Sequence, residues 1–211
     1  MSTETILCVE TRILEGITAS RGFLPASVID PKDVLKSDFA LFAPRYRIEN
    51  RDDFRQIIPY IILRHKSSVA MYTRTSQGAE QRLYSFSSIG FGGHVELKDI
   101  VLDEDGLLNV ETTIEKAAIR EIEEEVEYTA VASKEVVGLI MDDRDLVNRV
   151  HLGIVEIWHL ETAFVRPLED TISECRFMPI CEIPLDEDRI EWWSYLCLAF
   201  LQENCPGRIK K

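Results

Sequence analysis

Arg120-Glu121-Ile122-Glu123-Glu124-Glu125 is the stretch that decides how this chain is interpreted. It places four carboxylates within five residues, inside a segment whose apolar residues follow a helical period. At about 3.6 residues per turn, Glu121, Glu124 and Glu125 share one face of that helix. Glu121 and Glu125 repel each other at the i,i+4 spacing, and a divalent cation would reverse that cost. An acidic run is usually a solvated helix face, so the surrounding sequence has to distinguish a metal site from a charged surface.

The acidic run belongs to a predicted amphipathic helix over residues 112–127. Thr112 or Thr113 is the expected N-cap, and with Thr112 in that place Glu115 falls at the capping-box position. The helix therefore has a recognisable start as well as an acidic face. Its buried stripe, spaced by four residues, is expected to consist of Ala118, Ile122 and Val126.

A glycine-rich segment, Gly90-Phe91-Gly92-Gly93-His94-Val95-Glu96, precedes the helix and follows an alternating strand pattern over residues 83–89. Glycines of this kind let the backbone approach a ligand or a metal closely. His94 is expected to be a hydrogen-bonded polar residue rather than a catalytic one, and the role of Glu96 stays open. A close-approach element thus stands upstream of the acidic helix.

The composition fits one sizeable domain, or one domain with an appendage, in a chain of 211 residues. A net charge of −13 argues against a nucleic-acid polymer or an anionic membrane surface as the main partner. Anionic small molecules stay open as substrates, because a bound metal inverts the local potential. The sequence shows neither a signal-peptide pattern nor an apolar run of about 18 residues, so we expect a cytoplasmic protein without a membrane span.

The five cysteines are odd in number and show no CxxC or Cys/His ligand spacing. We therefore expect free thiols, as in a reducing cytosol. These residues are Cys8, Cys175, Cys181, Cys197 and Cys205.

Apolar runs bounded by polar turns predict strands over much of the remaining chain. A second amphipathic helix is expected over residues 190–202, with Trp192, Trp193, Leu196 and Phe200 as its apolar candidates. Several strands with one internal and one terminal helix predict an α/β sandwich around a mixed sheet. The expected strands are 57–63 and 68–73, which form a hairpin, 136–141, 150–160 and 175–179.

Residues 1–50 are expected to form an N-terminal extension that packs on a main domain over residues 51–211. Within the extension, residues 8–14 are a candidate strand and residues 31–42 contain a short helix. The extension and the Trp192-Trp193 pair offer apolar surface for a homodimer, although no sequence feature decides the oligomeric state.

Taken in this order, the double glycine and the acidic helix resemble the Nudix hydrolase family. The family's box is a glycine, five residues, a glutamate, seven residues, then Arg-Glu-apolar-x-Glu-Glu-x-Gly-apolar. Gly92 and Gly93 fit the usual Gly-Gly opening. The second half of the box is matched by Arg120, Glu121, Ile122, Glu124, Glu125 and Tyr128.

The sequence departs from that box in two places. The spacing from Gly93 to the helix is too long, as if about ten residues were inserted around residues 98–110, so Thr112 stands where the family has glutamate. Glu127 stands where the family has a helix-ending glycine, which predicts a different exit from the helix. Glu123 and Glu127 are expected to face solvent.

The resemblance implies a Nudix-like α/β/α sandwich around a mixed sheet, and a metal site. Glu121, Glu124 and Glu125 would bind Mg²⁺ or Mn²⁺, with the carbonyl of Gly92 or Gly93 as a further ligand. Glu111 is the candidate for the missing box carboxylate.

The resemblance also implies a catalytic set of Glu124, Glu121, Arg120 and a carboxylate from a later loop. Arg120 would pair with a box glutamate and hold it in place, and its i,i+4 spacing to Glu124 makes that pairing easy. Glu174 is the expected later carboxylate, with Asp142 and Asp143 as alternatives.

The implied reaction is hydrolysis of a phosphorus-containing acid anhydride, namely the diphosphate linkage of a small nucleoside diphosphate-type substrate. Metal ions would neutralise the phosphate oxygens and lower the pKa of bound water, and a carboxylate would accept its proton. The alternatives are a Nudix-fold sensor that binds such a ligand without turnover, and an acidic interaction protein outside the family. Substrate identity is not encoded in a recognisable motif. Expected substrate contacts are Arg45, Tyr46 and Phe91.

Overall fold

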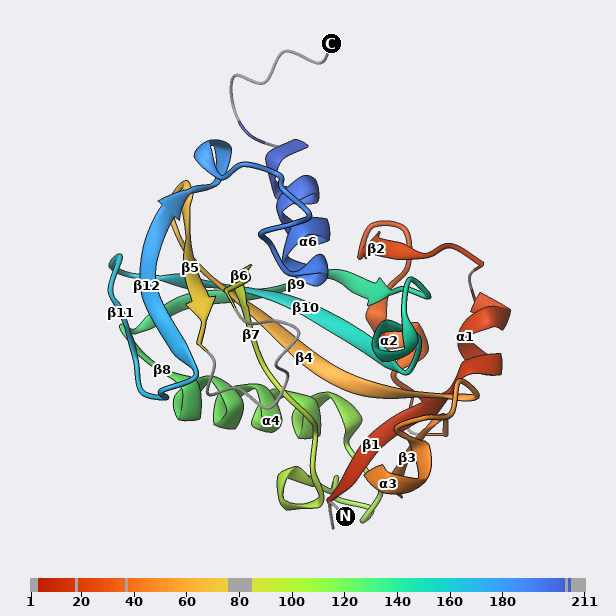
Figure 1. The fold of residues 1–211 in the computed structure, drawn as a ribbon. Helices are drawn as coiled ribbons and strands as arrows, with labels where there is room; N and C mark the ends of the chain where they lie inside the picture. The colour runs from red at the N-terminus through yellow and green to blue at the C-terminus, as the bar shows by residue number, and fades with distance from the viewer. Residues whose placement is uncertain (1–3, 18, 37, 76–84, 204, 206–211) are drawn as a thin grey trace. The chain divides into compact units, whose positions relative to one another are not determined.

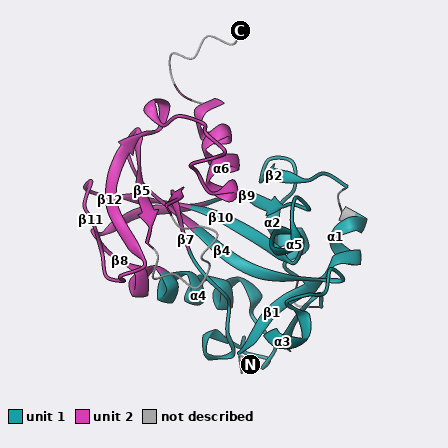
Figure 2. Ribbon diagram, in the orientation of Figure 1, with its two compact units in different colours: residues 1–60, 92–121, 136–156 teal, residues 61–91, 122–135, 157–211 magenta. Residues whose placement is uncertain are grey.

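The computed structural model describes residues 4–17, 19–36, 38–75, 85–203 and 205 (Figure 1). The chain forms two compact units, which Figure 2 draws in different colours. Unit 1 comprises Met1–Tyr60, Gly92–Glu121 and Val136–Glu156, and unit 2 comprises Ile61–Phe91, Ile122–Glu135 and Ile157–Lys211. Whether residues 1–50 behave as an extension of a main domain stays a prediction.

In unit 1, the N-terminal strand β1 (Thr5–Glu10) pairs antiparallel with β3 (Ala40–Pro44) and with the first half of β4 (Phe54–His65). The prediction of a strand over residues 8–14 is wrong in its second half, because helix α1 (Thr11–Ile17) begins directly after β1. Strand β2 (Gly22–Pro25) pairs with the end of β9 (Val131–Met141). Three further short helices are α2 (Pro31–Val34), α3 (Arg45–Ile48) and α5 (Leu146–Arg149).

In unit 2, β5 (Ser68–Arg74) forms the predicted hairpin with the second half of β4. It also pairs with β6 (Ser87–Ser88) and β12 (Ile172–Pro179), all antiparallel. The remaining elements of this unit include β7 (Gly90–Phe91), β8 (Val126–Tyr128), β11 (Val165–Pro167), η3 (Ile180–Glu182) and α6 (Trp192–Glu203). Residues 76–84, which include part of the predicted strand over 83–89, lie outside the described residues.

The large sheet has the strand order β12-β5-β4-β10-β9-β2, where β10 is His151–Leu160. Successive residues of β4, from Ile61 to Leu63, are all almost fully buried, so both faces of this strand are covered. The same holds along β10 from Leu152 to Trp158. The predicted α/β sandwich around a mixed sheet is confirmed.

The acidic segment lies in α4 (Val110–Glu125). The helix begins earlier than predicted: Asn109 caps it, with its Oδ1 accepting from the Thr112 amide at 3.1 Å, so neither threonine is the N-cap. Thr113 is buried instead, and its hydroxyl accepts from the Val101 amide at 3.0 Å. The helix ends at Glu125, because the next residues enter strand β8.

The expected apolar stripe of α4 is confirmed, since Ala118, Ile122 and Val126 are buried, the last of them on β8. The second predicted helix is present as α6, and its four apolar candidates, Trp192, Trp193, Leu196 and Phe200, are half-buried. The fully buried side includes Ser194, Cys197 and Leu198 instead. Ser194 is drawn inward because its hydroxyl accepts from the Ile89 amide at 2.8 Å.

Two cysteines are joined, which corrects the expectation of free thiols throughout. Cys181 in η3 and Cys205 after α6 form a disulfide across a sequence separation of 24 residues. Cys8, Cys175 and Cys197 are free. The odd count concealed the pairing, because a disulfide depends on the spatial proximity of two loops and not on a local motif.

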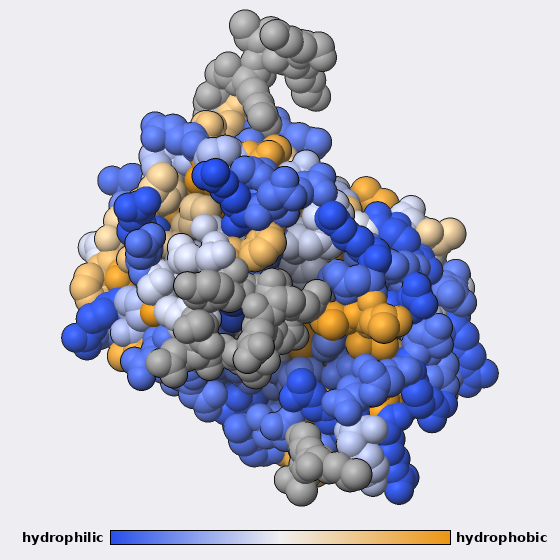
Figure 3. All heavy atoms as spheres, viewed as in Figure 1, coloured by the Kyte–Doolittle hydropathy of each residue, from blue (hydrophilic) through white to orange (hydrophobic). Residues whose placement is uncertain are grey.

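No helix in the described part of the chain is long and apolar enough to cross a membrane. The face drawn in Figure 3 is mostly hydrophilic, with hydrophobic residues in separate clusters. This surface is in keeping with the net charge of −13.

Candidate functional site

Neither position of the double glycine has room for a Cβ atom. A Cβ built on Gly93 would lie 2.4 Å from Oε2 of Glu121 and 2.7 Å from Oε1. Gly92 has a φ of +150°, and a Cβ there would lie 1.9 Å from the carbonyl oxygen of Pro59. One glycine therefore lets the backbone approach a carboxylate of α4, and the other lets it approach β4.

Arg120 links three parts of unit 1. Its Nε and Nη2 donate to the two oxygens of Asp99 at 3.0 and 2.8 Å, and Nη1 donates to Glu121 Oε1 at 2.6 Å. Nη2 also donates to the carbonyl oxygen of His94 at 2.9 Å. The guanidinium thus connects the glycine segment, α4 and the short helix that carries Asp99, and it orients the carboxylate of Glu121.

Asp99 is the partner that sequence reasoning missed. It is 1% exposed and ends the short helix η2 (Leu97–Asp99). Burial alone would raise the pKa of Asp99, but hydrogen bonds from Arg120 and from the Glu96 amide outweigh it, so the pKa is lowered. The available signal was the spacing of Glu96 and Asp99, which form a capping box around η2 at the start of the segment interpreted as inserted.

His94 is a hydrogen-bonded polar residue, as expected. Its Nε2 lies 2.9 Å from Oε1 of Gln56, and its ring centroid lies 5.6 Å from that of His151. Burial, with the charge of Arg45 and the neighbouring His151, lowers the pKa of His94 to about 3. The imidazole is therefore neutral at pH 7.

Glu121, Glu124 and Glu125 lie within the last two turns of one continuous helix. Glu124 is exposed, whereas Glu125 is half-buried and its Oε2 atom is buried. Carboxylate and carbonyl oxygens form the donor set that Mg²⁺ and Mn²⁺ prefer, so the chemistry of these residues fits such an ion. Within the described residues, no three Asp, Glu, His or Cys side chains form a ready-made metal site.

The structure does not bring Glu111 to these carboxylates. It lies in the first turn of α4, ten positions before Glu121, which is about 15 Å along a helix. Its side chain is 74% exposed and pairs with Lys32 at 3.1 Å. Its expected role as a metal ligand therefore has no geometric support.

The candidate later carboxylates differ in their surroundings. Glu174 is exposed in unit 2 and has a φ of +51°, where the register of β12 shifts between Ser173 and Arg176. A bulge of this kind redirects a side chain and is common beside functional sites. Asp142 and Asp143 lie in unit 1, where the Asp142 carbonyl oxygen and the Asp143 carboxylate accept from buried Arg55.

The expected substrate contacts are not equally accessible. Arg45 donates to Glu4 at 2.8 Å, and Tyr46 is 46% exposed. Phe91 is fully buried, with its ring centroid 4.8 Å from that of Tyr72. A ligand could reach the first two side chains directly, while Phe91 supports the glycine segment from within the core.

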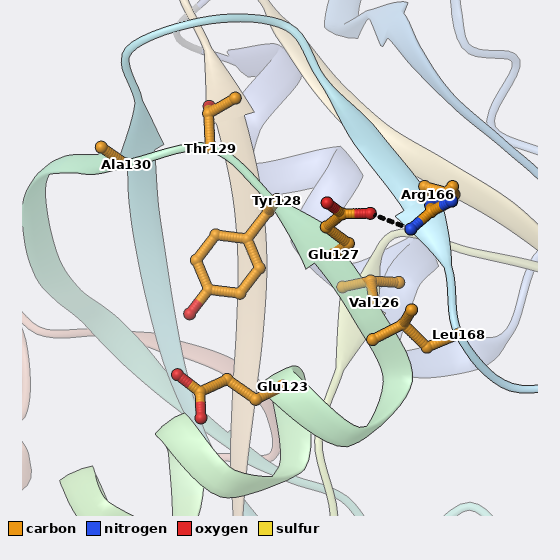
Figure 4. Close-up of a pocket in the computed structure, with 8 residues that line it drawn as sticks. All are labelled: Glu123, Val126, Glu127, Tyr128, Thr129, Ala130, Arg166 and Leu168. Atoms are coloured by element: carbon orange, nitrogen blue, oxygen red, sulfur yellow. Dashed lines mark ion pairs between the residues drawn. The ribbon is translucent and has the colours of Figure 1, made fainter.

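A pocket of about 490 Å³ lies beside the exit of α4 in unit 2 (Figure 4). Glu127 on β8 is ion-paired there with Arg166, its register partner on β11. The helix passes directly into β8, which is a different exit, as the missing glycine predicted. Both Glu123 and Glu127 are exposed, as expected. The pocket is lined by Glu123, Val126, Glu127, Tyr128, Thr129, Ala130, Arg166 and Leu168.

Comparisons with known proteins give two substantial similarities. Protein YmaB of Bacillus subtilis (strain 168) is 31% identical over 154 residues, which are 71% of this chain and 72% of that protein. The crystal structure of Tm1382, described as a candidate Nudix hydrolase, has a TM-score of 0.76 and 26% identity, and covers 95% of this chain and 99% of its own.

A more distant structure is a MutT Nudix hydrolase from Burkholderia pseudomallei. It is 15% identical with a TM-score of 0.44, and the match covers 69% of this chain and 96% of that one. No family model matches the chain.

Proposed function

Because this chain belongs to the Nudix family, we propose that it is a metal-dependent hydrolase of a diphosphate linkage in a small nucleoside diphosphate-type substrate. Family membership supports a pyrophosphohydrolase-type activity. The single observation that carries the proposal is the close approach of Gly93 to Glu121, whose carboxylate Arg120 fixes. Gly93 leaves the space that the Glu121 carboxylate occupies, and Arg120 orients that carboxylate.

The residues that would hold Mg²⁺ or Mn²⁺ are Glu121, Glu124 and Glu125, with the carbonyl of Gly93 as a further oxygen. A bound ion of this kind neutralises phosphate oxygens and lowers the pKa of coordinated water. Arg120 keeps the Glu121 carboxylate in one orientation, and the buried Asp99 keeps Arg120 in place.

A carboxylate would also accept a proton from the attacking water. Glu124 is exposed at the end of α4 and is our first candidate for this role, with Glu174 as the alternative. Arg45 and Tyr46 are proposed to contact the substrate, because both side chains reach solvent. Phe91 would act through the position of the glycine segment.

The alternative function is a Nudix-fold sensor that binds a nucleotide-like ligand without turnover. Two observations favour it: about ten additional residues lie around positions 98–110, and Glu127 pairs with Arg166 where the family has glycine. The survival of all three core glutamates favours the enzyme.

A screen of nucleoside diphosphate derivatives with Mg²⁺ or Mn²⁺ tests the two functions. We expect Glu124→Gln to lower kcat by at least about 100-fold, because it removes a charged ligand or base. Glu123→Gln is the matched control, since Glu123 is exposed on the same helical turn and outside the proposed ligand set. Turnover that survives Glu124→Gln unchanged would contradict the assigned role. Binding without turnover on any diphosphate would favour the sensor.

A further inference from the structure

Arg74 is the last residue of strand β5 and forms an ion pair with Glu191. This pair is not part of the proposed metal site. The Nε of Arg74 donates to Oε1 of Glu191, just before α6. The Glu191 side chain is 9% exposed, whereas that of Arg74 is 30% exposed. One partner is thus enclosed, and the other reaches solvent.

Glu191 is held by the backbone on both sides. Its amide donates to the Ser87 carbonyl at 2.9 Å, and the Ser87 amide donates to the Arg189 carbonyl at 2.8 Å. The Glu191 carbonyl then accepts from the Tyr195 amide at 2.8 Å in the first turn of α6. The carboxylate is therefore a fixed anchor for the guanidinium.

Tyr72 fixes the guanidinium from another side. The Arg74 Cζ lies 5.6 Å from the centroid of the Tyr72 ring, a cation–π distance. The Tyr72 hydroxyl donates to the Gly90 carbonyl at 2.9 Å, two residues before the double glycine. Arg74 is thereby oriented next to the segment that leads into the proposed site.

Glu125 places this arginine within electrostatic range of the acidic helix. Burial alone would lower the pKa of Arg74, but the charges of Tyr72, Glu191 and Glu125 raise it overall. Glu125 also raises the pKa of Tyr72, after the larger effect of burial. The charge of Glu125 in α4 thus acts on both side chains at this end of β5.

The ion pair with Glu191 uses one edge of the guanidinium. A guanidinium carries five N–H donors, and the Nε contact leaves the two Nη groups for other acceptors. Among the described residues, Glu191 is the carboxylate to which Arg74 is hydrogen-bonded. A partly buried Arg–Glu pair of this kind contributes little net stability.

We propose that Arg74 binds a phosphate group of the substrate, and that Glu191 is the positioning residue that orients its guanidinium toward that phosphate. The proposal rests on the proposed function, since it places the phosphate beside the carboxylates at the end of α4. Arginine suits this role because its planar fork matches phosphate oxygens.

Calorimetric titration of the full chain with α,β-methylene-ADP and Mg²⁺ tests the proposal without interference from turnover. We expect Arg74→Ala to raise Kd by at least about 10-fold, because charge-assisted hydrogen bonds are lost. Arg74→Lys keeps the charge but loses the fork, so its Kd should lie between those of Arg74→Ala and the unchanged protein. Arg64→Ala is the matched control, because Arg64 lies on β4 in the same unit and donates to the Lys66 carbonyl. Its Kd should equal that of the unchanged protein.

Glu191→Gln separates positioning from folding. The amide keeps the volume and one acceptor oxygen, so we expect the thermal midpoint to change little while Kd and KM rise. Equal Kd values for Arg74→Lys, Arg64→Ala and the unchanged protein would overturn the role of Arg74, even where hydrolysis is observed. Binding that weakens in Arg74→Lys while no diphosphate is hydrolysed would support Arg74 and reject the enzyme. If the unchanged protein does not bind the analogue, both the phosphate-binding role of Arg74 and the proposed function are overturned.

Discussion

Gly93 and Glu121 lie so close that a single added methyl group would occupy the position of the Glu121 carboxylate: a Cβ on Gly93 would lie 2.4 Å from Oε2. The atoms in the way, Oε1, Oε2 and Cδ, form the far end of a flexible side chain. We therefore expect Gly93→Ala to displace the carboxylate rather than to unfold the protein. Hydrolytic activity should fall by at least about 10-fold, with a stability cost at or below about 1–3 kcal/mol.

Alanine substitutions at two other glycines serve as controls for Gly93→Ala, with stability measured by urea denaturation and activity by hydrolysis assays. Gly92→Ala meets the Pro59 carbonyl oxygen at 1.9 Å with a φ of +150°, so it should destabilise the protein more than Gly93→Ala. Gly16→Ala has no heavy atom within 4 Å and lies in α1, so it should be neutral or slightly stabilising. Full activity of Gly93→Ala would show that the position of the Glu121 carboxylate does not matter for turnover.

Arg120 and Asp99 form a second testable pair. Because Asp99 is 1% exposed, Arg120→Ala leaves a carboxylate buried without its main cation, and we expect about 3–5 kcal/mol of destabilisation. Arg120→Lys keeps the charge but cannot bridge Asp99, Glu121 and His94 together, so it should lose activity with a smaller stability cost.

Arg12 provides the control for that measurement. Its side chain is 81% exposed and pairs with Glu10, so Arg12→Ala should change the free energy of unfolding by less than about 1 kcal/mol. Equal effects of Arg12→Ala and Arg120→Ala would mean that the Asp99 contact contributes no more than a surface ion pair.

The acidic helix was predictable because its signals are local. The periodic stripe with Ala118 and Ile122, the strand hairpin and the two longest helices, α4 and α6, all follow from spacing along the chain. The start of α4 was less predictable: Asn109 competes with Thr112 for the cap, and the structure places Asn109 there because the helix begins at Val110. Such competition is settled by tertiary packing and not by propensity.

Within the candidate site, the sequence indicated the residues of α4 and the glycine segment but not their partners. Asp99 accepts a hydrogen bond from Arg120 across 21 residues of sequence, and no local pattern predicts such a contact. The Arg74–Glu191 pair, outside the proposed metal site, spans 117 residues and was not predictable for the same reason. Glu111 shows the opposite failure: it satisfied the family spacing approximately, yet the continuous helix carries it away from Glu121.

Asp143 gives a prediction for the pH dependence of stability. Burial raises its pKa, but hydrogen bonds from Arg21 and Arg55 outweigh burial and lower the pKa in the folded protein. A lowered folded pKa contributes stability above the unfolded value of about 3.9, and that stability is lost as the pH falls through the folded pKa. The unfolding free energy should therefore fall below about pH 4, and Asp143→Asn should make this fall shallower.

Urea denaturation between about pH 2.5 and pH 7 measures the difference. The carboxylate is 40% exposed, so solvent screening reduces the effect. The pH profile of Asp53→Asn is a useful comparison, because the exposed ion pair between Asp53 and Arg51 also lowers the pKa of Asp53. A pH profile of Asp143→Asn that superimposes on that of the unchanged protein would remove the Arg55–Asp143 contact as a source of acid sensitivity.

The Cys181–Cys205 disulfide ties the end of α6 to η3 and predicts a reductant-dependent stability. In the chain-entropy model, a bridge across 24 residues stabilises by roughly 3 kcal/mol, so Cys181→Ser or dithiothreitol should lower the thermal midpoint by several degrees. Cys175→Ala is the control, since Cys175 is a free, half-buried thiol, and the reductant should shift its midpoint as it shifts that of the unchanged protein. Alkylation under denaturing, non-reducing conditions followed by mass spectrometry should label three cysteines. Labelling of all five, with no response of the midpoint to dithiothreitol, would show that the bridge does not form in solution.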